Sequence, residues 1–375
     1  MDVKPAAFLR TTLPLDLSCL TDLDSGRYHS VWLPDHMVSF WPDALWTTEF
    51  TDLATVSPSA HRHLDGLAVA AAAAALTSRV PLATSVVDTV RRHPALLAQS
   101  ALTIDHLSRG RFILGLGSGE SENIAPYGFE FAKPVSRFEE SLKVIRLLWD
   151  TAGPVDFTGQ FYRLEHARLD TEPYDGRFPP IWIGASGPRM LEIVGRYADG
   201  WWPAGAWTPE HYAEMLAVVR QSADRAGRDP MAITPCFVQV CLIGEDDAAI
   251  ERIVRAPLVA SFLLQVSAQV LRGFGFDHPM GADWGGFHDI NPVTMTRERI
   301  LDFLGRVDPD AILAVVPHGT PTDVARIIKS YVDAGLRVPK ILDYATMAGR
   351  EFGAASAANV RKTEDELLAL CTGPS

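Results

Sequence analysis

Side chains that could bind a cofactor and move protons are gathered in residues 115–128, which read G-L-G-S-G-E-S-E-N-I-A-P-Y-G. Three alternating glycines, Gly117 and Gly119 among them, leave a backbone that a flat group can approach closely. The stretch also offers Ser118, Asn123 and two carboxylates. Its spacing fits neither the dinucleotide fingerprint nor a phosphate loop ending in Gly-Lys-Ser/Thr. An ordinary strand-to-loop turn is the alternative interpretation.

Asp35 and His36 form a second pair with chemical potential, directly after the apolar run Ser30–Leu33. A histidine can donate or accept a proton near neutral pH, and a carboxylate beside it can fix its tautomer. A capping aspartate followed by a surface histidine is the alternative. No metal site is expected, because no third histidine or cysteine stands at ligand spacing from this pair.

Two further loops carry polar groups. Residues 84–88 read T-S-V-V-D and are followed by the basic pair Arg91 and Arg92. Residues 184–188 read G-A-S-G-P and lead into a helical pattern, so backbone N–H groups there could bind a phosphate. A simple helix cap is the alternative for the second loop.

The elements that must position these groups alternate between short β-type runs and longer helical patterns. This alternation predicts a parallel sheet covered by helices. Eight runs have strand character: Ala6–Thr11, Ser30–Leu33, Leu82–Val87, Arg111–Leu116, Pro180–Gly184, Gly200–Pro203, Ile233–Ile243 and Val338–Tyr344. We therefore predict an α/β fold, a single (β/α)8 TIM barrel over residues 1–375. The polar groups above then follow the carboxyl ends of its strands, where such barrels keep their chemistry.

Start and stop signals mark several of the helices. Ser136 and Glu139 have the spacing of a capping box. Thr208 and Thr320 each precede a first-turn proline, and Gly335 is expected to end the helix that follows Thr320.

The chain is longer than the roughly 250 residues that a barrel needs. The surplus falls in three insertions at residues 37–65, 150–179 and 245–296. The first contains Phe40, Trp41 and Trp46, and the third contains Phe274, Phe276, Trp284 and Phe287. Insertions of this kind can form a lid or an apolar substrate wall, with packing beneath long loops as the alternative.

Composition excludes several classes of function. The 375 residues are 47% hydrophobic and 21% charged, with a net charge of −12, which disfavours nucleic-acid and anionic-membrane partners. No signal peptide is recognisable, and the most apolar run, Leu67–Leu76, is too short to span a membrane. The four cysteines lack metal-ligand spacing and are interpreted as reduced thiols of a cytoplasmic protein.

Four segments in order resemble the bacterial luciferase-like superfamily. They are W-x-x-D-H after the second strand, T-S-V-V, R-F-I-L-G-L-G-S-G-E-S-E-N and P-I-W-I-G-A-S-G-P-R. Within the superfamily they are most similar to the branch that uses the deazaflavin coenzyme F420. The runs Y-G-F-E-F-A-K-P-V-S-R-F-E-E and H-P-M-G-A-D-W further resemble the mycobacterial phthiodiolone ketoreductases, which act on a waxy lipid.

The resemblance implies roles for individual residues. Ser85 and Val86 match a non-proline cis peptide that supports the deazaflavin ring. The cofactor site implied by the resemblance comprises Ser85, Val86, Gly117, Ser118, Gly119 and Asn123 at the ring, and Ala185, Ser186 and Gly187 at the phosphate tail. His36 matches the proton donor or acceptor, oriented by Asp35, and Glu120 and Trp41 match the groups that close the site. Glu120 could also raise the pKa of His36.

The resemblance implies a reaction and its rivals. The expected enzyme is an F420-dependent oxidoreductase of the ketoreductase or alcohol dehydrogenase type, acting on a lipophilic substrate in lipid metabolism, and dimeric like many relatives. Asp88 departs from the family pattern and adds a negative charge near the ring. The stretch 201–207 lacks the lysine of the sugar-phosphate branch. An FMN-dependent monooxygenase with a separate flavin reductase is the alternative, and a non-catalytic cofactor-binding protein is a further one.

Overall fold

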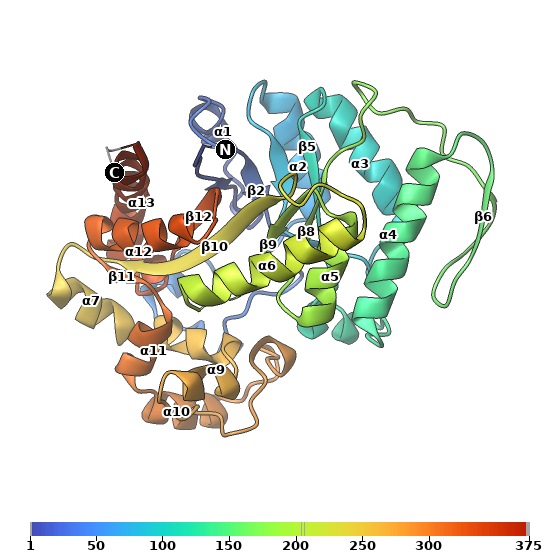
Figure 1. Ribbon diagram of the computed structural model, residues 1–375. Helices are drawn as coiled ribbons and strands as arrows, with labels where there is room; N and C mark the ends of the chain where they lie inside the picture. Colours follow the sequence, from blue (N-terminus) through green and yellow to red (C-terminus); the bar gives the residue numbers. More distant parts are fainter. Residues whose placement is uncertain (1, 204, 206, 373–375) are drawn as a thin grey trace. The chain divides into compact units, whose positions relative to one another are not determined.

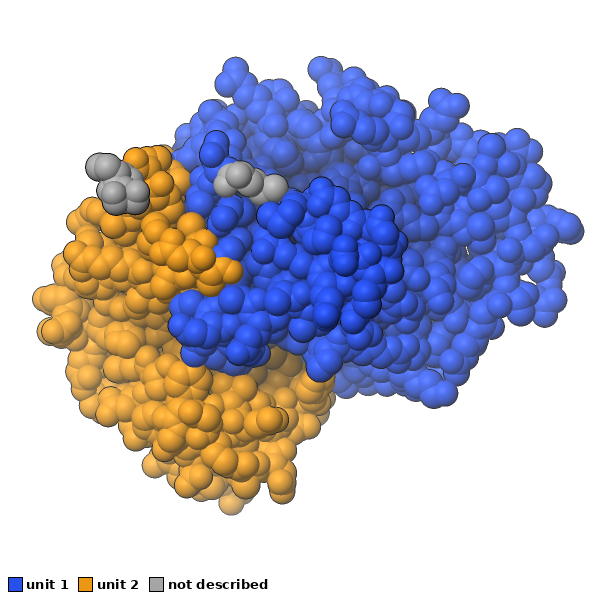
Figure 2. All heavy atoms as spheres, in the orientation of Figure 1, with its two compact units in different colours: residues 1–36, 63–237, 335–340 blue, residues 37–62, 238–334, 341–375 orange. Residues whose placement is uncertain are grey.

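The chain forms two compact units, each assembled from several segments. The computed structural model describes residues 2–203, 205 and 207–372. Figure 2 shows unit 1 in blue and unit 2 in orange. Unit 1 comprises Met1–His36, His63–Phe237 and Gly335–Lys340, and unit 2 comprises Met37–Arg62, Val238–Ala334 and Ile341–Ser375. A single domain over residues 1–375 stays a prediction.

A series of parallel strands forms the centre of unit 1. In order of pairing they are β1 (Ala7–Phe8), β2 (Val31–Leu33), β3 (Leu82–Thr84), β5 (Phe112–Gly117), β8 (Ile181–Gly184), β9 (Gly200–Trp202) and β10 (Thr234–Ile243). The last strand, β12 (Val338–Asp343), pairs with β10, and Ala6 bridges Lys340 in parallel. The strands therefore close on themselves as the predicted (β/α)8 barrel, and each of the eight predicted runs overlaps one of them.

Strands that are buried on both faces need apolar side chains throughout. Every residue of β2, β3, β5 and β9 is buried accordingly. The short strand β4 (Val87–Asp88) continues beyond β3 and also pairs with β5. The chain between them makes the cis peptide Ser85–Val86, at the predicted position.

Helices cover the strands of unit 1. Figure 1 shows α3, α4, α5 and α6 outside β5, β8 and β9. The helices of this unit are α1 (Leu20–Leu23), α2 (Gly66–Leu76), α3 (Pro94–Ser108), α4 (Pro134–Asp150), α5 (Pro188–Tyr197) and α6 (Pro209–Arg225). The second insertion adds the antiparallel hairpin β6 (Val155–Thr158) and β7 (Arg163–Ala167), which lies beside α4.

Unit 2 contains the other two insertions and the C-terminal helices. Its elements besides the ends of β10 and β12 are α7 (Asp247–Val254), α8 (Pro257–Ala260), α9 (Ala268–Gly273), α10 (Arg297–Arg306), α11 (Pro309–Val315), β11 (His318–Gly319), α12 (Pro321–Asp333) and α13 (Arg350–Thr372). Aromatic residues of the two insertions pack together, with the Phe40 and Phe287 ring centroids 5.2 Å apart. No helix among the described residues is long and apolar enough to cross a membrane.

Two of the three predicted caps are confirmed and one is wrong. Thr208 accepts a hydrogen bond from the backbone N–H of His211, and Thr320 forms a capping box with Asp323. The predicted box at Ser136 and Glu139 does not form, because α4 already begins at Pro134. A first-turn proline requires no N–H partner, so the N-cap is Lys133 instead of the predicted Ser136.

One glycine shows how closely the outer helices pack. A Cβ added at Gly195 of α5 would lie 2.5 Å from both Cβ of Ser222 and the backbone oxygen of Val219 on α6. We predict that Gly195→Ala lowers the free energy of unfolding by about 1–3 kcal/mol through overpacking. Gly353→Ala in α13 is the matched control, because nothing lies within 4 Å of its added Cβ. That variant should gain about 0.5–1 kcal/mol, and equal effects in urea denaturation would contradict the packing argument.

Candidate active site

The carboxylate of Asp35, at the exit of β2, joins three segments of unit 1. Only 4% of Asp35 is exposed. Its oxygens accept hydrogen bonds from Gly66 N at 3.0 Å, Arg91 Nη2 at 2.7 Å and Arg92 Nη1 at 2.6 Å. The orientation of His36 by Asp35 stays a prediction, and the hydrogen-bond partners described for this carboxylate are the two arginines and a backbone N–H. Its charge still contributes to raising the pKa of His36.

Arg91 and Arg92 also bind two neighbouring carboxylates. Arg91 Nε donates to Asp88, and Arg92 Nη2 lies 2.6 Å from Asp65 Oδ2. Asp88 additionally accepts hydrogen bonds from the backbone N–H groups of Val90 and Arg91. Asp88 is thus an ion-paired carboxylate instead of an uncompensated charge. The sequence showed the basic pair but not its distant partners, of which Asp35 lies 57 residues before Arg92.

A second polar cluster joins the ends of β2 and β5. Nδ1 of His36 lies 3.4 Å from Glu120 Oε2. Asn123 Nδ2 lies 3.1 Å from the same oxygen, 3.4 Å from His36 Nδ1 and 3.3 Å from Glu122 Oε1. The ring of His63 adds an aromatic neighbour, 5.6 Å from the His36 ring between centroids. His36, Glu120 and Asn123 are therefore brought together as predicted, whereas the position of His63 was missed.

The cluster shifts the protonation of its members. Burial lowers the pKa of His36, but the hydrogen bond and charge of Glu120, with the charges of Asp35 and Glu122, outweigh this and raise it. Burial raises the pKa of Glu120, but its interactions with His36 outweigh burial and lower it. Both shifts favour an imidazolium–carboxylate pair at neutral pH. A histidine held in this form can give a proton to an oxygen on which negative charge develops.

Glycines leave room for the Val86 side chain and for the carbonyl group of Thr84. A Cβ at Gly117 would lie 2.7 Å from Val86 Cγ2, and one at Gly184 would lie 3.4 Å from Val86 Cγ1. A Cβ at Gly115 would overlap the carbonyl oxygen of Thr84. The alternating glycines thus allow residues 84–86 to pack against β5. Next to them, Gly119 takes φ +94°, a conformation that favours glycine and turns the chain toward Glu120.

The predicted phosphate loop comes directly before α5. Ala185 is fixed by a backbone hydrogen bond from its N–H to Trp202 O at 3.0 Å. Gly187 is the N-cap residue, no side chain caps the helix, and open space surrounds the position of its Cβ. Together with Ser186, this end of α5 could take an anionic group. Of the neighbouring loop 203–207, Ala204 and Ala206 lie outside the described residues.

Trp41 belongs to unit 2, whereas the residues described above belong to unit 1. Its ring lies 6.4 Å from Trp46 and 6.0 Å from Tyr344 between centroids. The indole Nε1 is buried, and no hydrogen-bond partner for it is found among the described residues. This donor could therefore serve a bound molecule.

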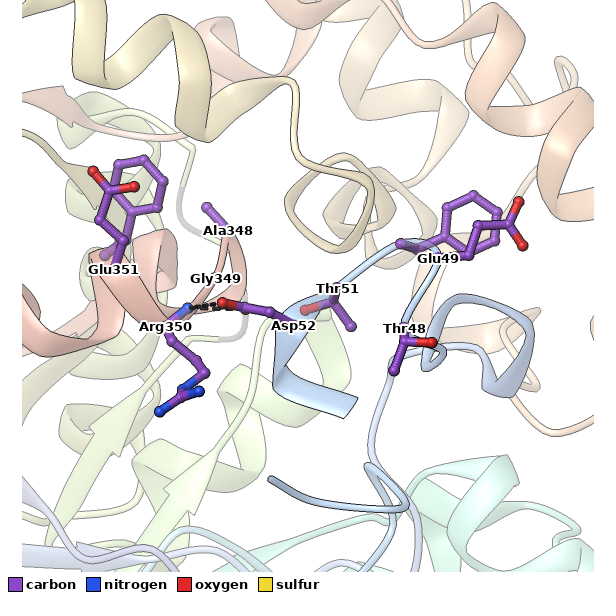
Figure 3. Close-up of a pocket in the computed structure, with 10 residues that line it drawn as sticks. Thr48, Glu49, Thr51, Asp52, Ala348, Gly349, Arg350 and Glu351 are labelled. Atoms are coloured by element: carbon purple, nitrogen blue, oxygen red, sulfur yellow. Dashed lines mark hydrogen bonds between the residues drawn. The ribbon is translucent and has the colours of Figure 1, made fainter. Parts of the chain in front are cut away.

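Unit 2 also has a surface pocket of about 280 Å³, formed by residues 48–52 and 348–352. Figure 3 shows the carboxylate of Asp52 pointing to the backbone nitrogen of Arg350, 3.0 Å away. Asp52 therefore binds the first turn of α13. None of the predicted site residues lines this pocket, so we interpret it as structural.

Comparison with known proteins gives results at three levels. The sequence model described as luciferase-like monooxygenase matches residues 22–337. The chain is 39% identical over 332 residues to a phthiodiolone/phenolphthiodiolone dimycocerosates ketoreductase of Mycobacterium bovis strain BCG, covering 88% of this chain and 87% of the relative. It is 39% identical over 162 residues to an F420-dependent glucose-6-phosphate dehydrogenase of Nakamurella multipartita, covering 42% and 47%.

Among solved structures, the chain resembles an F420-dependent secondary alcohol dehydrogenase in complex with an F420-acetone adduct. The TM-score is 0.71 at 19% identity, over 98% of this chain and 99% of that chain. At this identity the likeness shows the fold alone, and it agrees with the barrel described above.

Breaking the Asp35 network should destabilise the protein. Asp35→Asn leaves two buried arginines without their shared charge, and we expect a loss of about 3–5 kcal/mol in the free energy of unfolding. Asp65→Asn is the matched control, because the carboxylate of Asp65 is half-exposed and asparagine can still cap α2. It should cost less than about 1 kcal/mol. Similar midpoints for the two variants in guanidinium denaturation would show that Asp35 is not the central link.

Proposed function

Because the chain belongs to the luciferase-like monooxygenase family, we propose that it is a coenzyme F420-dependent oxidoreductase. It transfers hydride between the deazaflavin and a carbonyl or alcohol group of a lipophilic substrate. The relative that is 39% identical over most of both chains is named a ketoreductase, and the shorter match is named F420-dependent. The observation on this chain that carries the proposal is the His36–Glu120–Asn123 cluster beside the glycines of β5.

The residues of unit 1 fit a flat, anionic cofactor. Val86 of the cis peptide packs against Gly117 and Gly184, which gives a firm support against which a flat ring can lie. Ser118 and Asn123 follow in the same loop and supply polar groups. The open, uncapped end of α5 at Gly187 suits the phosphate of the cofactor's tail. When bound, a deazaflavin gives or accepts a hydride at its C5 carbon.

Within this site His36 manages the proton. In the direction of ketone reduction, the protonated ring gives a proton to the substrate oxygen as the carbonyl carbon receives hydride. Glu120 contacts the ring at Nδ1 and helps to hold it in place. In the direction of alcohol oxidation the neutral ring accepts the proton. Asp35 acts from behind by fixing the end of β2.

A lipophilic substrate and a role in lipid metabolism follow from the ketoreductase relative and from aromatic residues in the insertions. Trp41 stays a proposed site residue on the sequence resemblance, and its buried indole N–H has no hydrogen-bond partner among the described residues. The rings of Tyr344 and Trp46 near it make its surroundings in unit 2 largely apolar. The protein would then act as a phthiodiolone-type ketoreductase.

We further propose that the protein is a homodimer through the outer face of α2. Ala68, Ala72, Ala75 and Leu76 are exposed and recur at helical spacing, and Leu76 is 63% exposed. The adjacent α3 continues the apolar surface with Leu96, which is 58% exposed. Such a surface is typical of protein–protein contacts.

Light scattering coupled to size-exclusion chromatography tests the dimer. Ala72→Arg should convert a dimer to a monomer, because it places a charged side chain in the centre of this face while keeping helix propensity. Val293→Arg, at an exposed apolar residue of unit 2, should leave the mass unchanged. A wild-type monomer, or a dimer that survives Ala72→Arg, would refute this interface.

Fluorescence titration tests the cofactor. Trp202 lies next to the position of Gly184, so a bound ring should quench tryptophan emission. We expect saturable quenching by F420 at micromolar concentrations. His36→Asn should bind F420 within about threefold of wild type and reduce a long-chain ketone about 10²–10⁴-fold more slowly, as expected for loss of a general acid. Tight FMN binding without F420 binding would instead support the monooxygenase alternative.

A further inference from the structure

A third titratable group, Glu122, is buried beside the His36–Glu120 pair. It lies in the 3₁₀ turn Ser121–Asn123, which is closed by a hydrogen bond from Asn123 N to Glu120 O at 3.1 Å. Only 2% of Glu122 is exposed. Two neighbouring buried carboxyl groups cannot easily both be ionised. One of them must be protonated, or a positive charge must lie beside them.

The amide of Asn123 cannot donate to every acceptor around it unless His36 carries a proton on Nδ1. The amide of Asn123 has two hydrogens, but three acceptors lie within 3.4 Å of its nitrogen: Glu120 Oε2, Glu122 Oε1 and His36 Nδ1. Protonation of His36 removes one of these acceptors and adds a donor toward Glu120. The two amide hydrogens can then serve the two carboxyl groups.

The second oxygen of Glu122 shows where another proton belongs. Among the described residues, the buried Oε2 atom of an ionised Glu122 has no hydrogen-bond partner. Glu120 Oε2 and Glu122 Oε1 nevertheless lie 3.1 Å and 3.3 Å from the same nitrogen, Asn123 Nδ2, so the two carboxyl groups are neighbours. Two carboxyl groups form a hydrogen bond only when one of them carries a proton. Since Glu120 faces His36, Glu122 is the member of the pair that is better placed to hold it.

We propose that Glu122 is a positioning residue that remains protonated and donates to ionised Glu120, so that the pair presents a single negative charge to His36. For turnover, this inference rests on the proposed function, whereas the protonation is a property of the protein alone. Glu122 thereby keeps Glu120 charged and in place without making His36 an excessively weak acid.

A pH dependence follows from this arrangement. Burial, and then the charge of Glu120, raise the pKa of Glu122 to about 8. The other charged group facing it is His36, which opposes this shift, and Asp35 behind the ring is paired with Arg91 and Arg92. Above about pH 8, Glu122 ionises, His36 holds its proton more tightly, and proton donation to the substrate should slow.

The protonation of Glu122 also makes the stability of the folded protein depend on pH. Because the pKa of Glu122 is higher in the folded protein than in the unfolded chain, the folded state binds the extra proton between the two values. Its contribution to stability is complete below the unfolded pKa of a glutamate, about 4.3. The contribution is lost as the pH rises toward about 8.

Nuclear magnetic resonance of ¹⁵N-histidine-labelled protein, without cofactor or substrate, tests the proposal. The His36 ring signals are assigned from the His36→Gln spectrum and followed from pH 5 to 10. Wild type should show an inflection near pH 8 caused by Glu122, and Glu122→Gln should abolish it while retaining an N–H donor toward Glu120. Glu130→Gln, at an exposed carboxylate of the following loop, should retain the inflection.

Thermal unfolding provides a second readout on the same variants. The wild-type melting temperature should fall between pH 6 and 8 more than that of Glu122→Gln. Identical His36 titration curves and identical pH dependence of melting in the two proteins would overturn the role of Glu122. If both differ as expected but F420 does not bind, the proposed function fails and the proton assignment stands. If F420 binds, the alkaline decline of ketone reduction should be lost in Glu122→Gln.

Discussion

The bond between the Asp35 carboxylate and the pair Arg91 and Arg92 is the interaction on which the rest of the site depends. It connects the end of β2 to the first turn of α2 and to the loop before α3. His36 is the next residue along the chain, so the position of its ring follows from this junction. A buried ion pair of this kind adds little net stability compared with apolar packing, but it penalises every arrangement in which its partners separate. The junction therefore defines where the histidine can be.

The polar residues of unit 1 divide into two groups with different tasks. In the first, Asp35 and Asp88 are bound by arginines and hold backbone in place. In the second, Glu120 faces a histidine whose pKa it raises, so its charge controls a proton. This separation lets neighbouring carboxylates serve structure and chemistry without competing for the same cation. It also explains how Asp88 is tolerated where the family pattern has an uncharged residue.

Local patterns in the sequence predicted much of the fold. The eight apolar runs became the eight barrel strands because a parallel strand covered on both faces must be apolar throughout. Glycine alternation predicted the close packing at Val86, which depends only on the absent side chains of Gly115 and Gly117. The polar residues that follow β2 and β5 were also predicted to meet, since the carboxyl ends of parallel strands share one edge.

Pairings between distant segments could not be predicted in the same way. No feature of the sequence indicated that the basic pair of another loop binds Asp35, since a sequence does not show which charges a fold brings together. The cap of α4 was assigned to Ser136, although Pro134 allows the helix to begin earlier. The proton on Glu122 was not foreseen either, because it depends on burial and on three neighbours that only folding assembles.

The central claim is that this site brings a deazaflavin and a carbonyl group together for direct hydride transfer. The most direct measurement is mass spectrometry of the alcohol formed, in ordinary water, from a long-chain ketone and reduced F420 that carries deuterium at both C5 positions. The account predicts one deuterium on the carbinol carbon and no dependence on oxygen. An unlabelled alcohol, or a product formed only with FMN and oxygen, would contradict it.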